Sequence, residues 1–181
     1  QSPVTNNYRN KINLSFGYYN EKFEIGALQS DFTVIPANKN NKCSLIAIKI
    51  CEFLTDWITN NSKLTIFDHN TLGGFWRHIT IYNSNIYHIM IVLHIQNTDK
   101  YYKIWELEFA ILKFKLSRFI SENKYFLNSV YYQSSNSKKE TRNFDPYHLI
   151  YGSNSFFELL DNSIAQSNAL SPPPKIATVL S

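Results

Sequence analysis

Basic and aromatic residues open two stretches of this sequence in which apolar and polar side chains alternate. Arg9 and Lys11 precede one stretch, and because they are two residues apart they share a face of an extended strand. Trp76, Arg77 and His78 open the other, where a flat indole ring stands beside a guanidinium. Cations attract RNA phosphates and unstacked bases lie on such planes, so these residues predict RNA contact. The alternative is that the cations are solvated at strand starts and that Trp76 belongs to the core.

The sequence gives little support for a metal site, a nucleotide-binding loop or a serine nucleophile. Its five glycines are scattered, and Gly73-Gly74 lacks the strand-to-helix spacing of a phosphate-binding loop. No nucleophile-elbow sequence surrounds a serine. The five histidines show no metal-ligand spacing: His69, His78, His88, His94 and His148. We therefore predict no metal site, and structural roles for the histidines within strands.

The two cysteines, Cys43 and Cys51, stand eight residues apart on one predicted helix. Eight helical residues rise about 12 Å, whereas a disulfide needs Cα atoms within about 7 Å. We expect two buried, unreactive thiols with raised pKa values, which is the wrong direction for a nucleophile.

Composition indicates one folded domain of ordinary size. The chain has 181 residues, of which 44% are hydrophobic and 18% charged. Its net charge of +4 and isoelectric point near 8.9 permit an anionic partner without demonstrating one. No apolar run reaches the roughly 20 residues of a membrane span, and the first residues lack the layout of a secretory signal. We expect a soluble, intracellular protein whose true termini lie outside this chain.

Hydrophobic periodicity predicts the order of the elements. Two-residue alternation and short apolar runs predict strands over 12–19, 23–28 with a return to Pro36, 76–82, 86–95, 127–133, 147–151 and 155–160. Steps of three and four predict amphipathic helices over 43–58 and 101–122. Gly17 is predicted to mark a bulge or the end of pairing. This order predicts an α+β fold, with a largely antiparallel sheet and two amphipathic helices packed on it.

The second predicted helix is apolar over an unusually broad surface. Its main stripe runs from Trp105 to Phe119, and Ile104, Leu107 and Phe114 are among the residues that widen it. We expect so broad a surface to be mostly buried against the sheet. Three successive prolines then exclude helix and strand at 172–174 themselves, and a new apolar segment begins at Ile176. We predict a domain over 1–160, followed over 161–181 by a linker and the start of a second domain.

Several stretches together resemble one enzyme family. "SPVTNNYRNKINLSFG" at 2–17 is similar to the motif Ser-Pro-Val-x-x-x-Tyr-Arg-x-Lys/Arg, which opens the central domain in the tRNA branch of the RNA uracil-5-methyltransferases. "FELLDNSIAQSN" at 157–168 is similar to the family segment that precedes the methyltransferase domain. Between them, "TLGGFWRHITIYNSNIYHIMIVLHIQN" resembles the family's strand pair, with Trp76 and His94 at matching places. These enzymes make 5-methyluridine with S-adenosylmethionine.

The resemblance implies roles for individual residues. Arg9 and Lys11 shape or contact the RNA-binding face, and His94 lies near the RNA. Gln166 reaches toward the cofactor or the target uracil, and Asn168 supports the same pocket.

Two departures bear on the cofactor. Ile164-Ala165 replaces the family's usual aromatic, and prolines 172–174 stand where the family begins a helix. We therefore expect S-adenosylmethionine to serve the full-length enzyme and not to bind this chain alone.

The leading hypothesis is the RNA-holding central part of a tRNA uracil-5-methyltransferase, which grips a T-arm-like hairpin of tRNA. By resemblance, the nucleophilic cysteine, its glutamate partner and the glycine-rich cofactor site lie beyond residue 181, so the chain alone is expected to be inactive. Two alternatives remain open. One is a stand-alone RNA-binding module, and the other is a protein-interaction domain, favoured if the broad face of the helix over 101–122 is exposed.

Overall fold

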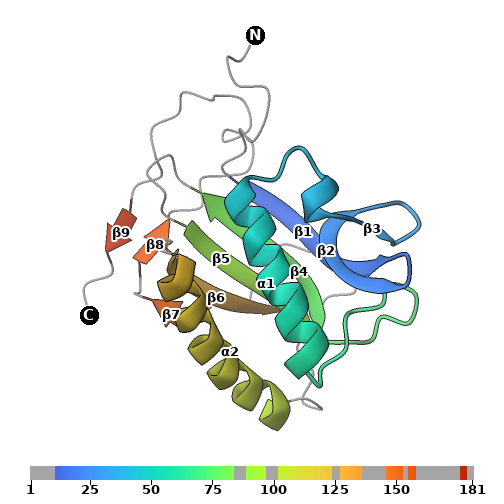
Figure 1. The fold of residues 1–181 in the computed structure, drawn as a ribbon. Coiled ribbons are helices and arrows are strands. Elements are labelled where there is room, and N and C mark those ends of the chain that lie inside the picture. The colour runs from blue at the N-terminus through green and yellow to red at the C-terminus, as the bar shows by residue number, and fades with distance from the viewer. Residues whose placement is uncertain are drawn as a thin grey trace.

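The computed structural model describes residues 11–83, 89–96, 102–123, 127–135, 146–152, 155–157 and 176–178. Seven strands form one sheet in the order β3-β2-β1-β4-β5-β6-β7, and helices α1 and α2 cover one of its faces (Figure 1). The elements of this layer pair are β1 (Lys11–Tyr19), β2 (Lys22–Leu28), β3 (Val34–Pro36), α1 (Leu45–Asn61), β4 (Trp76–Asn83), β5 (Ile89–Gln96), α2 (Tyr102–Asn123), β6 (Leu127–Ser135) and β7 (His148–Gly152). Five of the six strand pairs are antiparallel, and β5 with β6 is parallel. The predicted α+β class and largely antiparallel sheet are confirmed.

Strands β1 and β2 form the predicted hairpin. Its turn is Asn20-Glu21, whose φ angles of 49° and 64° are both positive, as in the turns whose twist suits two-residue hairpins. The prediction of a bulge at Gly17 is wrong, because Gly17 pairs in regular register with Glu24, although pairing with β4 ends at Ser15. The missing side chain instead makes room for a neighbour, since a Cβ at Gly17 would lie 2.7 Å from Val34 Cγ1.

Helix α1 begins at a serine cap. The Ala47 N–H donates to Ser44 Oγ at 3.2 Å, which satisfies one of the helix's first amide groups. The predicted apolar stripe is buried from Ala47 to Ile58, whereas Lys49, Glu52 and Asp56 are exposed. Cys43 is buried too, but it precedes the cap and lies outside the helix.

Helix α2 carries the chain from β5 to β6, which lets these two strands run parallel. The predicted stripe is confirmed, because Phe109, Leu112 and Leu116 are all buried. The expectation that this broad surface is mostly buried against the sheet is wrong for a part of it. A second row, which we call the outer stripe, is 40–68% exposed and comprises Ile104, Leu107, Ile111 and Phe114.

Both helices pack on an aromatic cluster centred on Trp76. This side chain is 0% exposed. Its ring meets Trp57 of α1 edge-on at a centroid distance of 5.8 Å and Phe109 of α2 at 5.9 Å. The alternative interpretation of Trp76 as a core residue is therefore the correct one, and its ring has no open face on which a base can stack.

A buried carboxylate connects this cluster to both helices. Trp76 Nε1–H donates to Ser62 Oγ at 3.1 Å, and the Ser62 hydroxyl donates to Glu108 Oε2 at 2.7 Å. Glu108, which is 4% exposed, also accepts from the Lys63 backbone N–H at 2.6 Å. The Glu108 side chain thus links α2 to the segment that follows α1.

The remaining elements lie near the carboxyl end. Strands β8 (Ser155–Phe157) and β9 (Ile176–Thr178) form a separate antiparallel pair. The predicted strand over 155–160 is confirmed as far as 157, and the predicted strand from 86 as far back as 89, because 158–160 and 84–88 lie outside the described residues. The predicted domain boundary at 160 lies outside them as well. Within the described ranges, neither helix has the length and hydropathy of a membrane-spanning segment.

Candidate functional site

Among the described residues, polar side chains gather on the face of the sheet opposite α1 and α2 (Figure 1). Side chains alternate along each strand, so Ile12, Leu14 and Phe16 point to the core while the residues between them point to the opposite face. Strand register then sets one polar row across four strands. Ser15 pairs with His78, His78 with His94, and His94 with Gln133. We call this set the polar row.

Hydrogen bonds fix the side chains next to the polar row. The hydroxyl of Thr80, which is 4% exposed, donates to Asn13 Oδ1 at 3.0 Å. Thr80 Oγ1 also lies 3.0 Å from His94 Nε2. Thr80 thus ties Asn13 of β1 to His94 of β5, and the tautomer of His94 sets which atom donates in the second contact. The imidazole of His94 is therefore held in one orientation.

The two histidines of the polar row are uncharged at neutral pH. Their rings stack at a centroid distance of 4.0 Å. Burial lowers the pKa of His78 to about 4, with the Arg77 charge contributing, and lowers the pKa of His94 to about 2, with His78, Lys11 and Arg77 contributing. His94 therefore offers hydrogen bonds and a ring surface to a ligand, but no positive charge.

Two cations flank this arrangement on the same strands. Lys11 Nζ lies 5.4 Å from the ring centroid of Tyr82, and burial lowers the pKa of this half-buried lysine. Arg77 Nη1 donates to Gln96 Oε1 at 2.9 Å, and its Cζ lies 4.5 Å from the Phe67 ring centroid. Lys11 pairs with Tyr82 at one end of β4 and Arg77 lies near the other, so the cations are roughly 17 Å apart along the strand.

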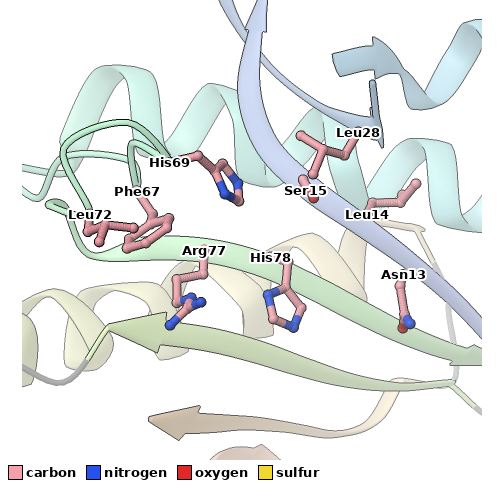
Figure 2. A pocket seen from close by; sticks show the side chains of 9 residues that line it. All are labelled: Asn13, Leu14, Ser15, Leu28, Phe67, His69, Leu72, Arg77 and His78. Carbon is pink, nitrogen blue, oxygen red and sulfur yellow. The ribbon is translucent and has the colours of Figure 1, made fainter. Parts of the chain in front are cut away.

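A cavity of about 460 Å³ opens beside Arg77 and His78. Figure 2 shows Arg77 and His78 projecting from β4 to the same side as Asn13 from β1, with Phe67 and Leu72 coming from the loop before β4. The cavity is lined by Asn13, Leu14, Ser15, Leu28, Phe67, His69, Leu72, Arg77 and His78.

The segment 65–75, which we call the pocket loop, forms one wall of this cavity. Asp68 accepts hydrogen bonds from the Asn70 N–H at 2.8 Å and the Thr71 hydroxyl at 2.9 Å, and these bonds lower the pKa of its carboxyl. Gly74 has a φ of 106°, and a Cβ there would lie 2.0 Å from the Ile66 carbonyl oxygen. Only glycine fits this position, so the pocket loop has a defined shape.

The residues predicted to contact RNA divide into three groups. Lys11, Arg77 and His94 lie on the face without helices, whereas Trp76 is in the core. The remaining three, Arg9, Gln166 and Asn168, lie outside the described residues. Sequence reasoning included His78 with Trp76 and Arg77 in a set that suits RNA, although it also gave the strand histidines structural roles. It missed the pocket loop, although polar residues alternating with Ile79 and Ile81 do signal a second functional face.

The chain is similar to known RNA methyltransferases. No family model matches it. It is 33% identical over 153 residues, 84% of its length, to a Fusobacterium nucleatum protein named as an uncharacterized RNA methyltransferase. It shares the fold of the Pyrococcus abyssi tRNA (uracil-54, C5)-methyltransferase crystallised with S-adenosyl-L-homocysteine, at a TM-score of 0.58, 16% identity and 88% coverage of this chain. The chain spans about a third of each protein, 31% and 35% respectively. The family resemblance predicted from the motifs is confirmed.

Proposed function

We propose that this chain is the RNA-holding part of an RNA uracil-C5 methyltransferase and that it binds a T-arm-like tRNA hairpin. The observation that carries the proposal is similarity over 84% of the chain to part of a protein named as an RNA methyltransferase. The face that carries Lys11, Arg77 and the polar row supports it, because it combines cations with fixed hydrogen-bonding groups. Arg9, predicted from its motif, is proposed to extend this face.

The chemical step is proposed to use residues that this chain does not contain. In the family it resembles, a cysteine thiolate adds to C6 of uracil before the methyl group passes from S-adenosylmethionine to C5. Burial raises the pKa of Cys43 to about 11 and raises that of Cys51 further, so neither is a thiolate at neutral pH. Gln166 and Asn168 remain the residues proposed to approach the cofactor or the uracil, and the domain division at 160 remains a proposal with them.

In this scheme the chain contributes positioning. Turning a uridine out of its stack costs a few kcal/mol, which contacts elsewhere on the hairpin must offset. Lys11 is suited to this task because a half-buried cation loses part of its hydration before any ligand arrives. A nearby phosphate restores favourable electrostatic interaction and stabilises the charged form.

Binding of a T-arm hairpin tests the proposal directly. The 181-residue chain is titrated with this hairpin and with a scrambled hairpin at two salt concentrations. We expect tighter binding of the T-arm hairpin, and affinity that falls as salt rises because counterions are released. Equal affinity for both hairpins would contradict the T-arm preference, and no binding would contradict the RNA-holding role.

Removing the two cations is expected to weaken this binding selectively. Lys11→Gln and Arg77→Gln should each lower affinity about tenfold and reduce the salt slope by about 1. Lys113→Gln and Lys115→Gln make the same charge change on the exposed side of α2 and serve as matched controls. Arg9→Gln tests the sequence-predicted partner of Lys11. An unchanged salt slope in the Lys11 and Arg77 variants would exclude phosphate contact at these positions.

Replacing either cysteine by alanine is expected to affect stability alone. Cys51→Ala removes a buried sulfur from α1 and should cost about 1 kcal/mol in urea unfolding. Hairpin affinity should not change. Loss of methylation by the full-length protein, with an unchanged unfolding midpoint, would show that the thiol is chemical rather than structural.

Protein docking is a second candidate function, and the outer stripe favours it. Leu107 and Phe114 are 64% and 68% exposed, which is unusual for neighbours of a helix's buried stripe. The gene sequence distinguishes the enzyme from a stand-alone RNA-binding module. If the enzyme proposal is correct, the gene continues into a glycine-rich cofactor motif and a later cysteine. A chain that binds no hairpin at either salt concentration would leave docking as the better supported function.

A further inference from the structure

We propose that the cavity between β1, β4 and the pocket loop binds one unpaired RNA base. This inference rests on the proposed RNA-holding function and adds a site within it. Its volume of about 460 Å³ falls within the roughly 300–1,000 Å³ usual for sites that enclose small organic groups.

Flat groups form the walls of this cavity. The Phe32 ring stacks on the His69 ring at 4.8 Å with an interplanar angle of 8°, and Phe67 meets the same ring edge-on at 5.2 Å. Arg77 lies over the Phe67 ring at 4.5 Å. Phe32 therefore holds one face of the His69 ring, and the base is placed against the remaining surface of this prepositioned ring at little further entropic cost.

Hydrogen-bonding groups line another part of the cavity. Ser15 and His78 are register partners on β1 and β4, and Asn13 lies two residues before Ser15 on the same face of β1. A hydroxyl, an uncharged imidazole and an amide can each donate or accept a hydrogen bond. That mixture suits the edge of a nucleobase, which presents donors and acceptors side by side.

The charge of the cavity also suits a base attached to RNA. Among the described residues that line it none is acidic, and Arg77 is the cation of this set. The nearby Asp68 carboxylate is occupied by Asn70 and Thr71 within the pocket loop. A phosphate attached to the bound nucleotide therefore meets a guanidinium. A wholly apolar ligand would leave the polar lining unmatched, which is costly.

A double-mutant cycle between protein and RNA tests the site. Affinities of the 181-residue chain are measured for the T-arm hairpin and for hairpins that are abasic at each loop position in turn. For the wild type we expect one abasic position to weaken binding about tenfold, as loss of one stacked base does. His69→Ala should weaken binding of the intact hairpin to a similar degree. In the His69→Ala variant, the abasic substitution at that position should cause no further loss of affinity, because both changes remove the same contact.

Two further variants keep the result interpretable. Leu72 lines the cavity at a φ of 55°, which asparagine adopts readily, so Leu72→Asn changes the wall with little strain and should reproduce the His69→Ala result. His148→Ala removes an exposed histidine that stacks on Tyr132 and should show no coupling to any abasic position.

The possible outcomes separate the two proposals. If the wild type binds the hairpin but no abasic position matters, or if His69→Ala weakens all hairpins equally, the base site is wrong and the RNA-holding function stands. If the wild type binds no hairpin, both proposals fail. A cavity variant that instead abolishes binding of a protein partner would assign the cavity to protein recognition and overturn the base site.

Discussion

Acidification from pH 7 to pH 4 is expected to destabilise this fold by several kcal/mol through His78 and His94. Their folded-state pKa values are lowered to about 4 and about 2 from 6.5. The unfolded chain therefore binds more protons below pH 6.5, and stability falls as pH decreases through that range. Each histidine contributes a loss of about 3 kcal/mol by pH 4. The two rings stack at 4.0 Å, and the charge that His78 gains on protonation is one of the causes that lower the pKa of His94.

Urea unfolding at several pH values between 7 and 4 measures this loss. His94→Gln should remove about half of it, because the pKa of this histidine is among the two that burial lowers. The exposed carboxyls of Asp31 and Asp68 have pKa values below 3.8, so most of their contribution is lost below this window. A wild-type stability that is flat between pH 6.5 and 4 would contradict the buried, uncharged state of the histidine pair.

Loss of the Glu108 carboxylate is expected to destabilise the fold by about 3 kcal/mol. Glu108→Ala removes the acceptor of two hydrogen bonds and leaves the Ser62 hydroxyl and the Lys63 N–H without it. Both groups are partly buried, so water replaces the carboxylate poorly. The Trp76 indole depends on the same serine, and the disturbance therefore reaches the aromatic cluster.

Two variants calibrate this prediction. Glu108→Gln keeps an acceptor for Lys63, but its amide adds a third donor to a Ser62 oxygen that already accepts from Leu64 and Trp76. It should cost less than alanine but more than nothing. Glu122→Ala breaks the 2.6 Å ion pair with Arg118, where both side chains are more than half exposed, and should cost about 0.5 kcal/mol or less. Equal effects of Glu108→Ala and Glu122→Ala would exclude a structural role for the buried carboxylate.

The sequence by itself determined the order and type of the strands and α-helices from β1 to β8, whereas β9 was not predicted. Alternation in β1 and β4 and three- and four-residue steps in α1 and α2 are local consequences of side-chain geometry, so they can be read without knowing the neighbours. The same patterns gave the sheet class. The short motif around Lys11 and the segment over 157–168 were enough to indicate the family, because their order and spacing are properties of the chain.

The tertiary structure alone decided which of these residues meet. Trp76 and Arg77 are neighbours on β4 and point to opposite faces of the sheet, but only the tertiary structure shows that the helices cover the face of Trp76 and that a cavity lies beside Arg77. The outer stripe of α2 is a second example. Apolar periodicity predicts how wide the apolar surface of a helix is, but not which part of that surface other elements bury. His78 and His94 form a stacked, uncharged pair only because the β4–β5 register places them opposite each other. Register and burial depend on contacts between distant segments, which no local pattern of residues contains.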